Sequence, residues 1–257
     1  MQNELNIALI QTDLVWKDRK TNLSNIEKIF SSIKEDIDII ILPEMFTTAF
    51  CVDDVRLAED INGGTTSWMQ RMAKEKNAAI CGSILYKEDS HYYNRFLFVE
   101  PNGKIHFYNK HHLFSLVNEH QYLTKGNDKL VISFRGWKLQ PFICYDIRFP
   151  AWCRNTDSYD LMMVVANWPV ARIHHWDALL KARAIENQSY VAAVNRIGTD
   201  GNGLQYNGHS TVFDMNGQEV LALGEKEGFE ALALDKQLLS AYRDQFRFLQ
   251  DRDPFTL

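Results

Sequence analysis

A series of short apolar runs separated by amphipathic segments constrains the fold of this chain more than any other feature. Runs of this length, bounded by turn residues, are typical of buried or half-buried strands. They cover residues 5–10, 37–42, 78–86, 96–99, 131–134, 139–143, 161–166 and 190–194. Segments with helical periodicity stand between several of them, at residues 21–34, 65–76 and 174–187. The order strand, helix, strand predicts an α/β fold.

The middle of the chain departs from this alternation. Between residues 78 and 109 one strand-like segment follows another, with turn residues at 88–90 and at Pro101-Asn102-Gly103. Pro, Asn and Gly favour tight turns between neighbouring strands, and a similar signal recurs at residues 214–217. We therefore expect mixed sheets, with residues 236–250 forming a helix or a packing arm.

Composition and charge limit the possible partners. The chain has 257 residues, 46% of them hydrophobic, and can bury the core of one large α/β domain. We expect a single domain over 1–257, whose segment from about 235 to 257 is the packing arm. Lys and Arg number 28 against 33 Asp and Glu, a net charge of −5, and no basic stripe is present. This balance argues against nucleic acid and membranes as partners and favours a small molecule.

The N-terminus and the cysteines add further expectations. The first residues carry no basic flank, and no apolar run approaches the roughly 18 residues of a membrane-spanning helix. We therefore expect neither a signal peptide nor a membrane anchor, and a cytoplasmic location. Cys51, Cys81, Cys144 and Cys153 include no Cys-x-x-Cys pair. Disulfides and structural zinc are not expected, so these residues are predicted to be free thiols.

Glu44 is the first of three reactive side chains that directly follow apolar segments. It stands after the apolar run and Pro43, and before Met45 and Phe46. A lone glutamate in a loop is usually solvated. Apolar neighbours instead predict a partly desolvated carboxylate, whose pKa is raised toward the range of a general base.

Lys110 and Cys144 are the other two reactive side chains that follow apolar segments. Lys110 follows a strand-like segment, and it is interpreted either as a reactive residue or as an ordinary surface lysine. The adjacent His111 and His112 do not favour a metal site, because neighbours on an extended segment point to opposite sides. Cys144 ends the run 139–143 and precedes a helical turn. Backbone N–H groups and the helix end there would lower the pKa of a thiol and offer oxyanion donors. A buried core cysteine is an equal alternative.

Three ordered motifs give these residues a common context. Leu-Pro-Glu-Met-Phe occupies 42–46, Asn-Lys-His-His-Leu-Phe occupies 109–114, and Ile-Cys-Tyr-Asp-Ile-Arg-Phe-Pro occupies 143–150. In this order they resemble the nitrilase superfamily of carbon–nitrogen hydrolases, whose hallmark is a Glu-Lys-Cys triad. The likeness runs from residue 5 to about residue 233, through Ala-Asn-Trp-Pro at 166–169 and Gly-His-Ser at 208–210.

The resemblance implies a role for each of these residues. Glu44 matches the family's general base, Lys110 the lysine that stabilises the intermediate, and Cys144 the nucleophile, which forms a thioester. Glu119 matches a second glutamate that lies beside the lysine, and the backbone N–H of Tyr145 would help to hold the oxyanion. The family further implies a four-layer α-β-β-α sandwich that pairs into homodimers, with no metal or cofactor.

The omega-amidases are the branch that looks most similar. They hydrolyse the terminal amide of 2-oxo acid monoamides such as 2-oxoglutaramate or 2-oxosuccinamate. Such a substrate needs a compact polar pocket, and we expect Tyr145, Trp168 and Arg172 to bind it, with Arg172 facing its carboxylate. Three alternative functions are an N-carbamoyl amino acid hydrolase, a nitrilase and a catalytically silent binding member. An alternative catalytic arrangement is a Cys/His pair in which His209 would reach Cys144.

Overall fold

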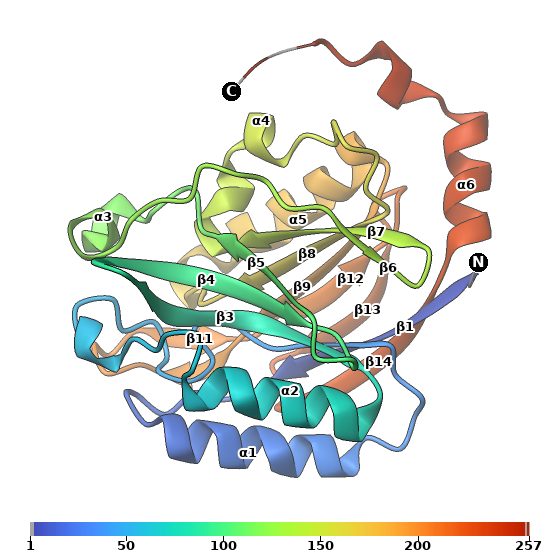
Figure 1. Cartoon of the computed structure of the whole chain (residues 1–257). Helices are drawn as coiled ribbons and strands as arrows, with labels where there is room; N and C mark the ends of the chain where they lie inside the picture. The colour runs from blue at the N-terminus through green and yellow to red at the C-terminus, as the bar shows by residue number, and fades with distance from the viewer. Residues whose placement is uncertain (1–2, 255, 257) are drawn as a thin grey trace.

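Two six-stranded sheets stacked face to face form the centre of the computed structural model, which describes residues 3–254 and 256 (Figure 1). In spatial order, the first sheet contains β14 (Gly228–Asp235), β1 (Glu4–Gln11), β2 (Ile39–Ile41), β3 (Ala79–Glu88), β4 (His91–Val99) and β5 (Ile105–Asn109). The second contains β13 (Glu219–Gly224), β12 (Ser210–Phe213), β9 (Tyr190–Asn195), β8 (Leu161–Ala166), β7 (Trp137–Ile143) and β6 (Ile132–Phe134). A short hairpin, β10 (Ile197–Thr199) and β11 (Gln205–Asn207), pairs separately.

The two sheets share one topology. In the first, β1, β2 and β3 run parallel, while β14, β4 and β5 are antiparallel to their neighbours. In the second, β7, β8 and β9 run parallel, and β6, β12 and β13 are antiparallel. The predicted mixed sheets are confirmed. In sheets of this kind, functional loops follow the carboxyl ends of the parallel strands.

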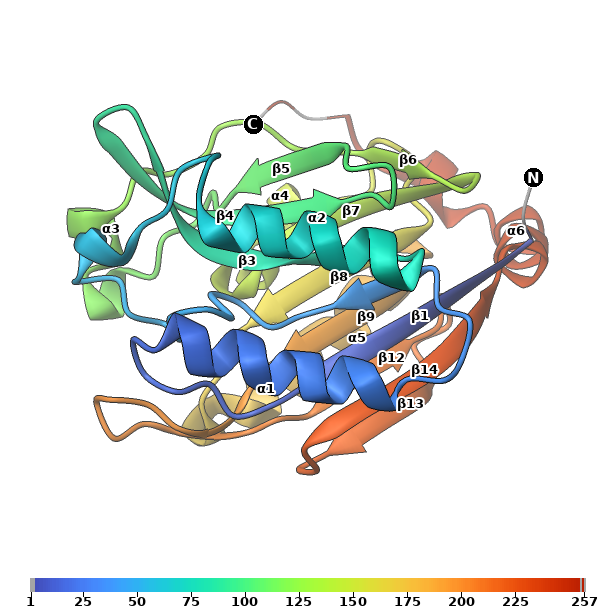
Figure 2. The ribbon, with the colours of Figure 1, turned by 60° about the horizontal axis from the view of Figure 1, so that its bottom comes forward.

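Helices cover the outer face of each sheet. As Figure 2 shows, α1 (Arg19–Ser32) and α2 (Gly64–Lys76) lie side by side over the first sheet. The outer face of the second sheet packs against α5 (Ile173–Asn187). The predicted four-layer α-β-β-α sandwich is thereby confirmed.

Strand β1 illustrates why the sheets are covered on both sides. Leu5, Ile7 and Leu9 belong to the core between the sheets, whereas Ala8 and Ile10 belong to the core beneath α1 and α2. Successive side chains of a strand point to opposite faces. An apolar run without alternation therefore requires a packed layer on each side.

Local side-chain chemistry sets the helix ends. The Asp18 side chain accepts a hydrogen bond from the Thr21 backbone N–H at 3.1 Å and starts α1. Asn77 and Gln188 end α2 and α5 in the left-handed conformation, with φ of 50° and 43°. The observed helices thus begin one or two residues before the predicted ones.

Some strands differ from the prediction, among them β4 and β14. Strand β4 begins at His91 rather than at residue 96, because its polar and aromatic first half is paired with β3 although it is not an apolar run. Strand β14 was not predicted, since it is a partly exposed edge strand that is fixed by its full-length pairing with β1.

The C-terminal segment packs against the second sheet and the end of α5. It contains α6 (Lys236–Gln245) and a 3₁₀ turn, η5 (Phe248–Asp251). Lys236 and Arg243 form ion pairs with Asp160 at 2.8 and 3.1 Å, and Gln188 donates to the Phe246 carbonyl at 2.6 Å. Positions 255 and 257 of the expected packing arm, and positions 1 and 2 of the N-terminus, lie outside the described residues.

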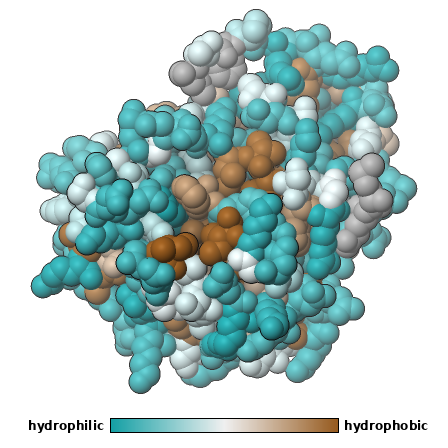
Figure 3. Space-filling view, in the orientation of Figure 1, coloured by the Kyte–Doolittle hydropathy of each residue, from teal (hydrophilic) through white to brown (hydrophobic). Residues whose placement is uncertain are grey.

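One face of the molecule has a mostly polar surface (Figure 3). The face in Figure 3 is largely hydrophilic, with a small group of hydrophobic side chains near its centre. Within residues 3–254 and 256, no helix combines the length and apolar character required to cross a membrane.

Core truncation should test the two-sided burial of β1. Leu9→Ala and Ile10→Ala should each lower the free energy of unfolding by about 2–5 kcal/mol, because each leaves a cavity in a different core. Leu238→Ala is the control, since Leu238 is 56% exposed and its loss should cost less than about 0.5 kcal/mol. Urea unfolding measures the free energy of unfolding of all three variants. An Ile10→Ala variant as stable as the wild type would contradict the packing of α1 and α2 on this strand.

Candidate active site

The ammonium group of Lys110 lies buried between two carboxylates. Lys110 follows β5, Glu44 follows β2, and Glu119 begins the short helix α3 (Glu119–Tyr122). The Lys110 Nζ donates to Glu44 Oε1 at 3.0 Å and to Glu119 Oε2 at 3.0 Å. All three side chains are 0% exposed. The structure thus brings together three residues that were singled out from the sequence.

The charges of this cluster stabilise one another. Burial alone would lower the pKa of Lys110, but the carboxylates of Glu119 and Glu44 outweigh it and hold this pKa above its ordinary value. Burial raises the pKa of the Glu119 carboxyl, although Lys110 acts against it. Lys110 is therefore a permanent cation at neutral pH.

Two asparagines complete the hydrogen bonding of Glu44. Asn94, on β4, donates through Nδ2 to Glu44 Oε1 at 2.8 Å. Asn167, which follows β8, donates its backbone N–H to Glu44 Oε2 at 2.8 Å and its Nδ2 to the Glu44 carbonyl at 2.8 Å. Asn167 follows a strand of the second sheet and Glu44 follows a strand of the first, so this contact links segments from the two sheets at the site.

Cys144 occupies a sharp turn at the end of β7. It has φ of +45°, in the left-handed region, and begins the 3₁₀ turn η3 (Cys144–Arg148). Non-glycine residues rarely adopt this conformation, and it is found preferentially at functional sites. Arg183 on α5 supports the turn, since its Nε and Nη2 donate to the Ile147 carbonyl at 2.9 and 2.6 Å. The predicted elbow is confirmed.

The expected low pKa of the Cys144 thiol is wrong. Burial and the negative charge of Glu44 raise the pKa of Cys144 well above its ordinary value, and Lys110 only partly opposes them. The position of Cys144 at a turn is not sufficient to lower the pKa of its thiol, because two carboxylates lie close to a single ammonium group and their negative charge disfavours the thiolate. At neutral pH Cys144 is therefore a thiol, and its use as a nucleophile requires a base.

Asp146 ties the turn of Cys144 to the segment that carries Lys110. Its Oδ2 accepts from the Ile143 backbone N–H at 3.0 Å and from the Tyr108 hydroxyl at 2.7 Å. Its Oδ1 accepts from the His112 backbone N–H at 2.9 Å. Asp146 is fully buried, so it fixes the end of β7 relative to residues on both sides of Lys110.

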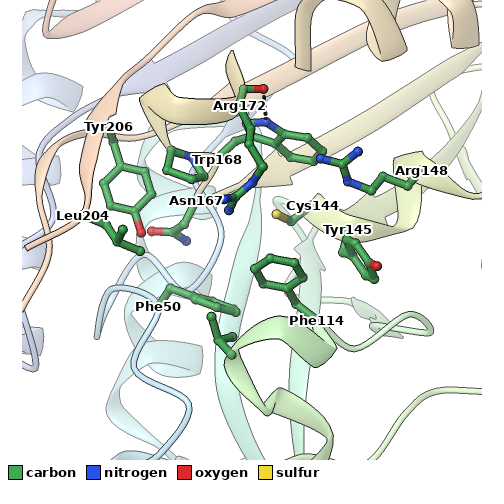
Figure 4. A pocket seen from close by; sticks show the side chains of 12 residues that line it. Phe50, Phe114, Cys144, Tyr145, Arg148, Asn167, Trp168, Arg172, Leu204 and Tyr206 are labelled. Carbon is green, nitrogen blue, oxygen red and sulfur yellow. Dashed lines mark hydrogen bonds between the residues drawn. The ribbon is translucent and has the colours of Figure 1, made fainter. Parts of the chain in front are cut away.

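A pocket opens over Cys144. Figure 4 shows Trp168 and the guanidinium groups of two arginines on one side of it, and Phe50 and Phe114 on the other. Its lining includes Phe50, Phe114, Cys144, Tyr145, Arg148, Asn167, Trp168, Arg172, Leu204 and Tyr206. Tyr145, Trp168 and Arg172 thus line the cavity that exposes the thiol.

Known proteins share this sequence and fold. Residues 6–244 match the family described as carbon-nitrogen hydrolase. The chain belongs to the carbon–nitrogen hydrolase family. It is 44% identical over 259 residues to the omega-amidase YafV of Escherichia coli K12, covering 98% of each chain. It is 32% identical over 250 residues to the 2-oxoglutaramate amidase of Bacillus subtilis, covering 95% of this chain and 96% of the relative.

A solved structure agrees with this assignment. XC1258 from Xanthomonas campestris is described as a CN-hydrolase superfamily protein with an arsenic adduct in the active site. It superposes on this carbon–nitrogen hydrolase with a TM-score of 0.97 at 38% identity, covering 100% of both chains. The resemblance read from the three motifs is therefore confirmed.

The histidines of this carbon–nitrogen hydrolase have other partners. His209 lies 3.1 Å from Asp177 through Nδ1 and 3.3 Å from Asn207 through Nε2, so its ring nitrogens are engaged by groups other than Cys144. His111 stacks on the Trp152 ring, with ring centres 3.6 Å apart. Across the described residues, no group of three or more His, Cys, Asp or Glu side chains is placed to hold a metal ion.

Several site residues were not singled out from the sequence. Asn94 and Asp146 contribute hydrogen bonds, and Arg148 lines the pocket. Asp146 and Arg148 stand inside the motif that follows Cys144, and Asn94 is a polar residue that precedes an apolar run. A polar residue beside a buried apolar run was the sequence signal that could have identified them, because a buried polar side chain requires a hydrogen-bond partner.

Replacing Asp146 should loosen the connection between the Cys144 turn and the Lys110 segment. In Asp146→Asn, an NH₂ group would face hydrogen-bond donors, which should cost about 1–3 kcal/mol in the free energy of unfolding. Asp157→Asn, at an exposed position, should change it by less than about 0.5 kcal/mol. Urea unfolding of the two variants makes the comparison, and equal stabilities would contradict the role given to Asp146.

Proposed function

We propose that this chain is a metal-free amidase that hydrolyses the terminal amide of small carboxylic acid monoamides, of the 2-oxoglutaramate or 2-oxosuccinamate type, through a thioester at Cys144. The observation that carries the proposal is the buried Lys110 held by Glu44 and Glu119 beside a pocket that exposes a thiol. Membership in the carbon–nitrogen hydrolase family and 44% identity to an omega-amidase support it.

In the first half of the reaction, Glu44 accepts the proton of the Cys144 thiol while the sulfur attacks the amide carbon. The carbonyl π-electrons move to oxygen, and the resulting oxyanion is stabilised by the ammonium of Lys110 and the backbone N–H of Tyr145. A base is needed because the pKa of Cys144 is raised. Glu119 holds Lys110 in position through hydrogen bonds of 3.2 and 3.0 Å.

In the second half, the oxyanion collapses and the C–N bond breaks. Glu44 returns its proton to the departing nitrogen, so ammonia leaves and a thioester remains on Cys144. Glu44 then takes a proton from a water molecule, which attacks the thioester carbon. The C–S bond breaks, the sulfur regains its proton from Glu44, and the free carboxylic acid is released.

Charge in the pocket favours an anionic substrate. Arg148 and Arg172 both line it, and in the part of the chain that the structure describes neither forms an ion pair with a carboxylate. Arginine binds carboxylates through paired N–H groups. A short substrate could therefore place its carboxylate at the arginines and its amide at Cys144, between the aromatic walls formed by Trp168 and Phe114.

An N-carbamoyl amino acid hydrolase and a nitrilase use related chemistry, and a catalytically silent member would show none. Ammonia release from a panel of amides, carbamoyl compounds and nitriles distinguishes these alternatives. The homodimer and the cytoplasmic location expected from the sequence stay predictions.

Removal of the nucleophile or of the base should stop turnover while the fold is kept. Cys144→Ala should abolish ammonia release, since no thioester can form, and Glu44→Gln should do so because an amide cannot carry the proton. Intact-mass analysis should detect a substrate-derived adduct on the wild type but not on Cys144→Ala. Retained activity in either variant would refute the mechanism, and loss of wild-type activity on chelation would point to a metal instead.

Substrate preference should follow the 2-oxo group. The value of kcat/KM for 2-oxoglutaramate or 2-oxosuccinamate should exceed that for glutamine or asparagine by at least about 100-fold, because the 2-ammonium group of an amino acid would be left without a partner near Arg172. Coupled ammonia assays give these constants. Comparable values for glutamine and its 2-oxo counterpart would refute the omega-amidase assignment while leaving the family and the cysteine chemistry in place.

A further inference from the structure

Arg148 is held in place from two sides. The centre of its guanidinium group lies 4.7 Å from the centre of the Trp168 ring, so the cation rests on an aromatic surface. Its Nη2 lies 3.1 Å from Nδ1 of His175, on the first turn of α5. Trp168 is itself fixed, because its Nε1 donates to the Arg172 carbonyl at 2.8 Å, the contact drawn as a dashed line in Figure 4.

The contact with Arg148 determines the protonation state of His175. A guanidinium group can only donate hydrogen bonds. Nδ1 of His175 must therefore be the acceptor, with the ring neutral and its proton on Nε2. The environment favours this state, since partial burial and the neighbouring side chains of His174, Arg148 and Arg172 lower the pKa of His175.

His175 contacts a residue of the pocket lining but is not itself part of that lining. Among the described residues, those that line the pocket include Arg148 and Arg172 but not His175. A free arginine side chain loses considerable rotamer entropy when it binds a ligand. A guanidinium group that is already stacked and hydrogen-bonded loses less, and its remaining N–H groups keep a fixed direction.

We propose that His175 is a positioning residue for substrate recognition: it holds Arg148 against Trp168 so that Arg148, together with Arg172, binds the carboxylate of the substrate. The inference rests on the proposed function, because it assigns the part of the site that binds the acid end of the monoamide. His175 acts on substrate affinity and not on the chemistry at Cys144. Its removal should thus raise KM and leave kcat nearly unchanged.

The test compares three variants on α5 with two substrates. His175→Ala removes the acceptor, His175→Asn can replace Nδ1 with its side-chain oxygen, and Lys181→Ala is the control at an exposed position of the same helix. With 2-oxoglutaramate, His175→Ala should raise KM about tenfold with kcat within about twofold, the effect of one charge-assisted hydrogen bond. His175→Asn should recover most of the loss, and Lys181→Ala should match the wild type.

A neutral amide without a carboxylate, such as butyramide, provides the second readout. The value of kcat/KM for this compound should be the same in His175→Ala and in the wild type, because Arg148 has no anion to bind. An equal loss for both amides would show a general structural effect and overturn the inference. So would an unchanged KM for 2-oxoglutaramate, or His175→Asn behaving like His175→Ala.

The outcomes also separate this inference from the proposed function. A wild-type protein that does not hydrolyse 2-oxoglutaramate contradicts the proposed function, and the role of His175 is then rejected with it. A wild-type protein that hydrolyses it, combined with an unaltered KM in His175→Ala, rejects the role of His175 alone. As an independent check, binding of the product 2-oxoglutarate to Cys144→Ala, measured by calorimetry, should weaken about tenfold when His175→Ala is added.

Discussion

The buried ammonium of Lys110 is the interaction on which the rest of the site depends. An uncompensated charge in a protein interior is strongly destabilising, so the group requires both Glu44 and Glu119 at 3.0 Å. Each carboxylate in turn needs further donors, which Asn94 supplies to Glu44 and the backbone N–H of Phe114 supplies to Glu119 at 2.6 Å. The position of the Glu44 carboxylate is thus fixed by the requirement to satisfy one buried cation.

The site also depends on the stacking of the two sheets. Glu44 and Lys110 follow strands of the first sheet, while Cys144 follows a strand of the second. Two polar side chains connect these groups: Asn167 reaches Glu44, and Asp146 reaches the residues that flank Lys110. Neither sheet alone carries Cys144, Glu44 and Lys110, so these side chains come together only in the assembled sandwich.

Cys144 combines an unfavourable left-handed backbone conformation with a thiol whose pKa is raised. Cys144 has φ of +45° and lines the pocket, and burial together with the charge of Glu44 raises the pKa of its thiol. A thiol in the resting state is less reactive than a thiolate toward incidental electrophiles. Under the proposed mechanism, Cys144 becomes nucleophilic only when Glu44 accepts its proton, which would couple reactivity to substrate binding.

The sequence by itself determined most of the buried strands, the long helices and the family. Uninterrupted apolar runs such as 161–166 predicted buried strands, and the motifs around Glu44, Lys110 and Cys144 pointed to one family. The tertiary structure alone decided the extent of β14, the pKa of Cys144 and the contacts of Arg148 and His175. The physical reason is that periodicity records burial along a short segment, whereas hydrogen bonds and electrostatic fields depend on groups that stacking brings together. Asn167 and Glu44 are 123 positions apart in the chain, and only the packed sheets place them 2.8 Å from each other.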